Sequence, residues 1–456
     1  MTYRRNICLI LMFLLSLAPL GTAHTAYTTA YTTAYNYVVT FYPRWFTFIQ
    51  SAIGAANRLI GPDRISPLYH AVVAINDDTL YASGYISITL DEPVIVSMPY
   101  TTDNYSVLQL DQYGDVFEGI PGNTPGLFAL VPVNWNGTLP HGVTQIVHIP
   151  YEHSVLIVRA DKYVKDQNGN YHNMRAEADR FRRHIGIATL SEFLSNQITP
   201  SMIVPELLFS VPYKAIAVHM IDTEPLSFLY LLRSSVLSPN TEQLTPDELA
   251  LSDAFNQFFS DPANYSQMTA AAQAAHADID TDYLTKTIAG TTWIHFTNIG
   301  EWLNPPQYLD RSAVTDYIQY GNNIQAAGYY HSFNAADGNP LDGSAHSYIL
   351  KFSKNQIPDV SRFWSVTAYL PLGIELVPNS ADKYVVASYT PGLVQAKDGS
   401  ITIYMSVTKP KAVPQANWLP IPPGPFNIML RAYGPGPDIV NNTYVPPPIL
   451  PPLVGD

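Results

Sequence analysis

Three polar residues, Asn76, Asp77 and Asp78, stand together in the otherwise apolar stretch INDDTLYASGY. The run before them is typical of a buried strand, and Tyr81 begins a run that predicts another. One interpretation is a tight polar turn that satisfies backbone groups at the strand ends. The other is a pocket floor, where Asp78 is a base or metal ligand, Tyr81 a hydrogen-bond donor and Asn76 a substrate contact.

Two further acids and an arginine are candidates for the same site. Asp111 and Asp115 follow a predicted strand. Carboxylates four residues apart can bind a hard cation, although a solvated turn is the commoner use of this spacing. Arg159 ends an apolar strand, where a buried guanidinium needs a carboxylate partner or an anionic ligand. We expect Asp111 to be catalytic together with Asp78 and Tyr81. We expect Arg159 to bind substrate and to pair with Asp78 or Asp111, with Asp78 preferred.

Trp418 and Arg431 are the candidates in the C-terminal part of the chain. Trp418 lies in the run NWLP, which is either a packing corner or a stacking wall for a sugar ring or an apolar ligand. Arg431 stands two residues before a tyrosine, in another cluster of aromatic and polar residues. We expect both residues to bind substrate, together with Asn76 and Arg159.

The sequence carries no motif for a nucleotide or flavin cofactor. It has no Gly-rich phosphate loop, no G-x-S-x-G turn, and no H-E-x-x-H run among its 12 histidines. The cofactor is therefore unknown, and a divalent cation remains an open alternative. The formal charge of -13 argues against nucleic acid and anionic membranes as partners, which leaves a small molecule or a glycan.

The N-terminus is typical of a secretory signal peptide. Two arginines precede an apolar run that is too short to span a bilayer, and small residues follow it up to Ala23. We expect cleavage after residues 1–23, a secreted protein and no transmembrane helix in the mature chain, with an uncleaved anchor as the alternative. The only cysteine, Cys8, lies in this segment, so the mature chain has no disulfide.

Four N-x-S/T sequons predict glycosylation on surface loops if the host glycosylates. The acceptor residues are Asn104, Asn136, Asn264 and Asn441.

The order of the predicted elements gives the fold class. Residues 24–67 read as a linker and a helix broken near Pro43, and residues 68–170 as short strands separated by turns. Residues 171–328 read as a helical segment, and strands return over 329–456. We expect a mainly β protein with a helical insert, in which two β-sandwich or jelly-roll-like domains are joined by an α-helical segment.

Several of these runs resemble a known family. INDDTLYASGY, DEPVIVSMP and VLIVRADKY resemble domain of unknown function 1254, and RFWSVTAYL, ANWLPIPPGPFNIMLRAYGP and YVPPPIL resemble domain of unknown function 1214. The resemblance covers about residues 68–164 and 290–450. It implies two β-sandwich or jelly-roll modules in mostly secreted or envelope-associated proteins, sometimes described as hydrolase-like. The loop EGIPGNTPG is shorter than is common in the family, which puts substrate contacts from that loop in doubt.

The function we expect is a secreted hydrolase-like enzyme that acts on an organic small molecule or polymer at the interface of the two β domains. The alternatives are a non-enzymatic secreted protein that binds a ligand or glycan or has a structural role, and a biosynthetic tailoring enzyme. An enzyme would gather carboxylates with perturbed pKa values in one concave site, whereas a binder would show a flat aromatic strip.

Overall fold

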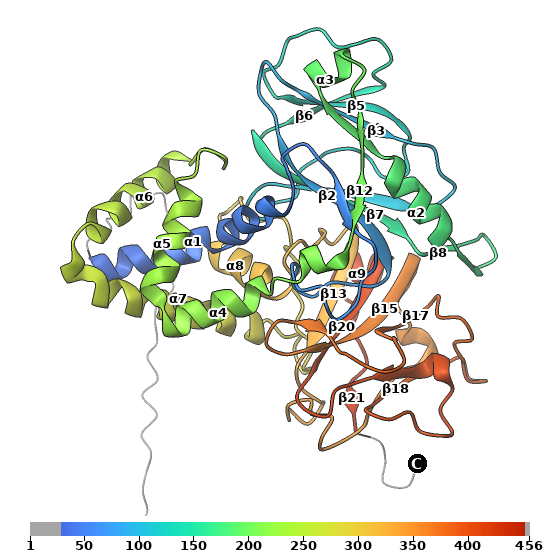
Figure 1. The fold of residues 1–456 in the computed structure, drawn as a ribbon. Coiled ribbons are helices and arrows are strands. Elements are labelled where there is room, and N and C mark those ends of the chain that lie inside the picture. The colour runs from blue at the N-terminus through green and yellow to red at the C-terminus, as the bar shows by residue number, and fades with distance from the viewer. Residues whose placement is uncertain (1–28, 452–456) are drawn as a thin grey trace, which may run out of the picture.

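The computed structural model describes residues 29–451. Figure 1 shows two β modules, one above the other, with a lobe of helices beside them. The blue and cyan strands of the upper module come from the N-terminal part of the chain, and the orange and red strands of the lower one from the C-terminal part. We call these the N-terminal module, the C-terminal module and the helical lobe.

The N-terminal module contains two five-stranded sheets. The first has the order β12 (Met202–Val204), β1 (Ile60–Pro62), β2 (Thr79–Ser87), β7 (His153–Asp161) and β4 (Tyr105–Leu110). The second has the order β11 (Thr199–Pro200), β10 (Gly186–Thr189), β3 (Val94–Met98), β5 (Gly126–Pro132) and β6 (Gln145–Ile149). Buried side chains of both sheets, such as Ala82 and Leu156 from the first and Val96 and Phe128 from the second, form one core with helix α2 (Arg175–His184).

Part of the segment that we expected to be helical belongs to this module. Strands β10, β11 and β12 and the short helix α3 (Leu190–Leu194) all fall within 171–328, and β10 and β12 extend the two sheets. The error has a simple cause. Phe181 and Ile185 have helical spacing, but the strand that follows is four residues long, and periodicity does not distinguish such short apolar runs. A turn at Asn168 and Gly169 joins β8 (Tyr163–Lys165) to β9 (Tyr171–Asn173).

The helical lobe surrounds helix α1 (Ala30–Gln50), whose side chains are buried along most of its length. The other helices are α4 (Tyr213–Thr223), α5 (Pro225–Val236), α6 (Pro246–Phe259), α7 (Tyr265–Thr285) and α8 (Tyr308–Tyr317), with 3-10 turns at Ser51–Ile53, Glu206–Phe209 and Pro262–Asn264. A capping box fixes the start of α6: the Thr245 side chain accepts from the N–H of Glu248, and the Glu248 side chain accepts from the N–H of Thr245.

The expectation that the first helix breaks near Pro43 is wrong, because α1 continues through this residue. Proline has no N–H, so the carbonyl of Val39, four residues earlier, loses its helical donor. Ser312 Oγ of α8 donates to that carbonyl over 2.7 Å. The neighbouring helix therefore compensates for the proline, and its contribution is invisible in the local sequence.

The C-terminal module also contains two principal sheets. The first has the order β13 (Ala327–Ser332), β20 (Asn427–Pro435), β15 (Val360–Leu370) and β16 (Glu375–Leu376), with β17 (Val385–Ala387) also paired to β15. The second has the order β19 (Trp418–Pro420), β18 (Ile401–Ser406), β14 (Tyr348–Phe352) and β21 (Ile449–Leu450). Helix α9 (Pro437–Val440) follows β20, and 3-10 turns lie at Lys354–Gln356 and Gln415–Asn417. Trp364 and Leu430 of the first sheet share a core with Ile403 and Met405 of the second.

The expected fold class, two β modules with helices between them in the chain, is confirmed. In each module two sheets share an apolar core, while the jelly-roll connectivity stays a prediction. Over residues 29–451, no helix combines the length and the apolar character that crossing a bilayer requires. The predicted signal peptide, residues 1–23, lies outside the described residues.

Candidate functional site

A cavity lies where the two modules meet. It encloses about 1020 Å³ of empty space, part of which is open to solvent. Its walls come from β2 and β7 of the N-terminal module, from β13 and β20 of the C-terminal module, from the end of α1, and from the segment after α8. The remaining wall is the segment 63–78 between β1 and β2, which we call the bridging loop.

The cavity floor follows from the pairing of β2 with β7. These strands are antiparallel, with Tyr81 opposite Arg159 and Tyr85 opposite Val155. Side chains alternate along a strand, so Tyr81, Ser83 and Tyr85 line the cavity together with Val155, Ile157 and Arg159. The residues between them, such as Ala82, face the module core. The floor is therefore polar at the Tyr81 and Arg159 end, and it becomes more apolar toward Val155.

Arg159 is buried, with 7% of its surface exposed, and its bonds go to neutral oxygens. Its Nη1 donates to Asn322 Oδ1 over 3.1 Å, and its Nη2 donates to the carbonyl of Tyr320 over 2.9 Å. Asn322 is held in turn by a bond from its Nδ2 to the Tyr329 hydroxyl, 2.7 Å away. The expected pairing of Arg159 with Asp78 or Asp111 is wrong, because the segment after α8 supplies these oxygens from a distant part of the sequence.

Asn76 forms the predicted turn and also reaches the C-terminal module. Its Oδ1 accepts from the N–H of Asp78 over 3.1 Å, and its Nδ2 donates to the Tyr433 hydroxyl over 2.6 Å. Arg431, on the same strand as Tyr433, donates from Nη2 to the carbonyl of Ala74. Its Nη1 is buried and has no hydrogen-bond partner in the described part of the chain. Both Asn76 and Arg431 line the cavity, where we expected a substrate site.

Asp78 is fully buried, but its side chain binds residues of the C-terminal module and does not line the cavity. Its Oδ2 accepts from Ser365 Oγ over 2.7 Å, and its Oδ1 accepts from the Tyr389 hydroxyl. Burial raises the pKa of the Asp78 carboxyl, while these two hydroxyls act in the opposite direction. Asp78 is not among the residues that line the cavity, although Tyr81 is. Its position fits a polar link between the modules better than a base that acts on a ligand.

Asp111 and Trp418 also lie outside the cavity lining. Asp111 Oδ1 accepts from the N–H groups of Tyr113 and Asp115, over 2.8 and 2.9 Å, so the two acids form a turn. This turn is buried and is not the solvated turn of the alternative interpretation. Burial raises the pKa of Asp111 to about 7, with the nearby carboxylate of Asp115 as the second cause. Trp418 is buried in the second sheet of the C-terminal module, and its Nε1 donates to Ser406. It is a packing residue there and does not form a wall for a ligand.

Sequence reasoning missed the tyrosine-rich character of the cavity. Six tyrosines line it: Tyr69, Tyr81, Tyr85, Tyr320, Tyr329 and Tyr433. The charged residues of the lining are three arginines, and within the described part of the chain it contains no Asp, Glu, His or Lys. The alternation of Tyr81, Ser83 and Tyr85 was visible in the sequence, but the contribution of Tyr320 and Tyr329 depends on how distant segments fold together.

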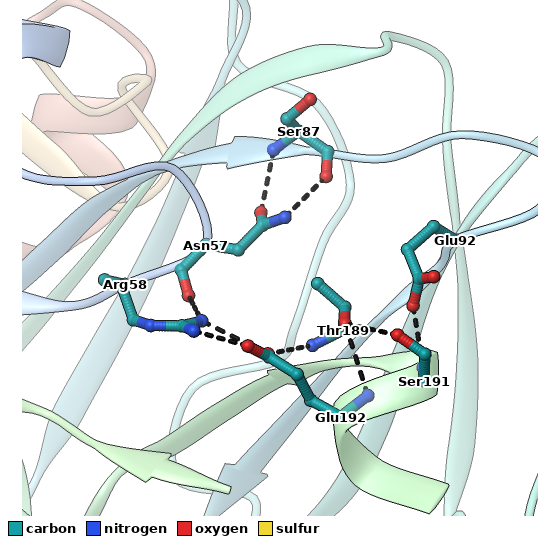
Figure 2. Close-up of polar contacts among 7 residues, drawn as sticks. All are labelled: Asn57, Arg58, Ser87, Glu92, Thr189, Ser191 and Glu192. Carbon is teal, nitrogen blue, oxygen red and sulfur yellow. Dashed lines mark hydrogen bonds and ion pairs between the residues drawn. The ribbon is translucent and has the colours of Figure 1, made fainter. Parts of the chain in front are cut away.

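The third arginine, Arg58, stands at the rim and is already paired. Figure 2 shows the network around it: Arg58 donates to both oxygens of Glu192, and Asn57 exchanges two hydrogen bonds with the backbone of Ser87. Glu192 also accepts from the N–H of Thr189, at the start of α3. This network fixes the segment before β1 against β2 and neutralises the charge of Arg58.

A second polar cluster lies inside the helical lobe. His276, Asp280 and Asp316 offer ligand atoms within 4.8 Å of one another, which is close enough for a metal ion. However, the ammonium of Lys214 binds Asp316, and the pair is buried, so this cluster already contains a cation.

The predicted glycosylation sites differ in exposure. Asn136 and Asn441 are exposed, whereas Asn104 and Asn264 are half-buried. Asn264 also uses its Nδ2 to donate to the carbonyl of Phe258 over 2.9 Å. Glycosylation therefore stays a prediction, with Asn136 and Asn441 as the most accessible acceptors.

Family models match the two sides of the cavity. Residues 56–187 match the family model DUF1254, described as a protein of unknown function. Residues 326–437 match the family model DUF1214, which has the same description. The chain therefore contains both domains, DUF1254 on the N-terminal side of the cavity and DUF1214 on the C-terminal side. The order of the domains is the one that the sequence predicted, and the first region contributes β2 and β7 to the cavity while the second contributes β13 and β20.

A solved structure shares the fold. The crystal structure of the VPA0106 protein from Vibrio parahaemolyticus superposes with a TM-score of 0.58 at 22% identity, covering 93% of this chain and 100% of that one. An uncharacterized protein from Burkholderia cenocepacia has a TM-score of 0.40 and 14% identity, covering 92% and 93% of the two chains. No curated protein matches the sequence.

Proposed function

We propose that the protein binds a small organic molecule in the cavity between its two β modules. The observation that carries the proposal is the cavity itself, which is lined by apolar side chains and a few convergent polar groups. Ligand sites in proteins typically have this composition and lie between domains. The polar groups, among them Asn76, Arg159 and Arg431, are held in place by bonds between distant segments.

The geometry favours binding over the hydrolase-like activity that we expected. Hydrolysis needs a nucleophile or an activated water next to a general base. The two candidate carboxylates, Asp78 and Asp111, hold turns and module contacts outside the cavity lining. A hydrolase would therefore need groups that the described lining does not offer, whereas a binding site needs only the groups that are present.

We also propose that the protein is exported and glycosylated. The N-terminal pattern of residues 1–23 supports cleavage after Ala23. The exposure of Asn136 and Asn441 supports modification at these two sequons. Intact mass of the secreted protein, before and after treatment with an N-glycosidase, tests both points, and a retained Met1 would contradict cleavage.

Binding of a neutral apolar dye tests the proposed cavity function. N-phenyl-1-naphthylamine should bind the wild-type protein saturably, which is followed by its fluorescence. Ser83→Trp places a large side chain in the middle of the floor and should weaken dye binding by about 10-fold or more because it fills the cavity. Ser361→Trp is the matched control, since it puts the same side chain on an exposed position of β15.

Two results would contradict the proposal. The first is a wild-type protein that does not bind the dye. The second is unchanged dye affinity in a folded Ser83→Trp protein, since that result would place the dye elsewhere on the molecule.

A further inference from the structure

We propose that the natural ligand of this cavity is an elongated organic acid, with its carboxylate bound by Arg159 and its apolar body lying along the floor toward Val155. This inference rests on the proposed function and names the chemical class of the ligand. It is carried by three features of the cavity: its charge, the unused donors of its arginines, and the gradient from polar to apolar along the floor.

The charge of the lining has one sign. Arg58, Arg159 and Arg431 are its charged residues in the described part of the chain, although the whole protein has a formal charge of -13. The pKa values of Tyr81, Tyr85 and Tyr433 are raised by burial, so these hydroxyls stay protonated and add no negative charge. A concave site with cationic groups and no anion concentrates anionic ligands.

The arginines differ in whether a carboxylate neutralises them. Arg58 is paired with Glu192. Arg159, in contrast, gives one hydrogen bond to an amide oxygen and one to a carbonyl, both neutral. A guanidinium has five N–H donors in a planar fork, so Arg159 keeps three for a ligand. A carboxylate matches this fork with two parallel charge-assisted bonds.

Arg431 supplies a second positive charge on the opposite wall. It is 2% exposed, and its Nη1 has no partner in the described part of the chain. The nearby acid Asp78 has both of its oxygens occupied by the hydroxyls of Ser365 and Tyr389. Asp78 still acts on Arg431 as a neighbouring charge, but no carboxylate contacts this guanidinium directly in the described part of the chain. Burial of a guanidinium is costly without such a contact, and an anionic ligand would offset that cost.

The floor sets the shape of the ligand. Arg159 and Val155 are four residues apart on one strand, which corresponds to roughly 13 Å. Ile157 lies between them on the cavity side, and Tyr69 and Phe209 also line the cavity with aromatic surface. A compact polar anion would leave this apolar surface without a partner, and a neutral apolar molecule would leave the guanidinium of Arg159 without one. An elongated molecule with one acidic end gives a partner to the apolar surface and to the guanidinium of Arg159.

The experiment compares two probes that differ in charge and share a ten-carbon chain. Decanoate and decan-1-ol each compete with N-phenyl-1-naphthylamine for the full-length wild-type protein at pH 7.5. Decanoate should displace the dye with a dissociation constant at least about 10-fold lower than that of decan-1-ol, the usual effect of one charge-assisted pair.

Arg159→Met tests the residue, and Arg183→Met, an exposed arginine of α2 outside the cavity, is the matched control. Arg159→Met should retain dye binding, which shows that its cavity is intact, and should lose the preference for decanoate. Arg183→Met should keep the preference.

The outcomes separate this inference from the proposed function. Equal displacement by the two probes, or displacement by neither while the dye binds, overturns the ligand class and leaves the binding function standing. A preference that persists in a folded Arg159→Met protein overturns the role of Arg159. Failure of the dye itself to bind overturns the proposed function. If Arg159→Met does not fold, the comparison of probes on the wild-type protein still decides the ligand class.

Discussion

Replacing Asp78 should weaken the contact between the two modules. Asp78 belongs to the bridging loop and is fully buried, and the hydroxyls that it binds, of Ser365 and Tyr389, belong to the C-terminal module. Asp78→Ala removes both acceptors and leaves two buried hydroxyls without partners. An unsatisfied buried group costs about 1–3 kcal/mol, so the free energy of unfolding should fall by about 2–6 kcal/mol.

Asp78→Asn should be milder. The amide keeps the shape of the carboxylate and one acceptor oxygen, so one hydroxyl remains bound and the other meets an NH₂ group. We expect a loss of about 1–3 kcal/mol at pH 5. Asp91→Asn is the control, because Asp91 is an exposed acid in the same module and its substitution should change stability by less than about 0.5 kcal/mol.

The pH dependence gives a sharper test, because its sign is fixed by the pKa. Burial raises the pKa of Asp78 in the folded protein above that of the unfolded chain. The folded state therefore binds the Asp78 proton more tightly, and wild-type stability falls as the pH rises above about 4, the unfolded value, toward the folded pKa. Asp78→Asn has no such proton. The deficit of Asp78→Asn relative to wild type should therefore shrink as the pH rises through this window.

Urea unfolding at pH 5 and pH 7.5, followed by tryptophan fluorescence and circular dichroism, measures these effects. If the modules uncouple, the single transition of the wild type should separate into two in Asp78→Ala, and the comparison is then between midpoints. Stability of Asp78→Ala equal to that of Asp91→Asn would refute the role of Asp78 as a link. A deficit of Asp78→Asn that grows with pH would refute the assigned direction of its pKa.

Three further predictions concern other parts of the structure. Lys214→Met should lower the free energy of unfolding by about 3–5 kcal/mol, measured by urea titration, because Asp316 remains buried without its ammonium partner. Ser312→Ala should cost about 1 kcal/mol, and adding Pro43→Ala, which restores the missing helical N–H, should remove most of that cost in a double-mutant cycle. A protein of residues 24–170 alone should aggregate, since it exposes the cavity floor and the bridging loop, and a sharp cooperative melt of a monomer would contradict this.

The strands were the most predictable part of the fold. The strand predicted before Asp111 is β4, which ends at Leu110. The errors occurred where a distant segment decided the local structure. Helix α1 passes through Pro43 because Ser312 donates to the free carbonyl, and β10 is a strand because β3 pairs with it. Ser312 is far from Pro43 in the sequence, and β3 is far from β10. No local sequence pattern could therefore predict either contact.

In the candidate site, too, local sequence predicted some features, whereas distant segments determined others. Asn76, Tyr81, Arg159 and Arg431 were chosen for their chemical type and strand position, and all of them line the cavity. The role of Asp78 could not be inferred from its chemical type and its position on the strand. A carboxylate among apolar residues must find partners, but only the fold determines that Tyr389, more than 300 residues later, provides one.

The polar run Asn76–Asp78, which ends the bridging loop, therefore has two separate tasks. Asn76 turns the chain and, with Tyr81 at the start of β2, faces the cavity, whereas Asp78 between them faces the C-terminal module. A site between two modules needs side chains of both kinds. Asn76 and Tyr81 would contact the ligand, and Asp78 holds the C-terminal module in place on the opposite side of the cavity. Because Arg431 binds the carbonyl of Ala74 in the same loop, the arginine on the far wall and the turn on the near wall are fixed by one short segment. This accounts for polar residues in so apolar a stretch without requiring that any of them be catalytic.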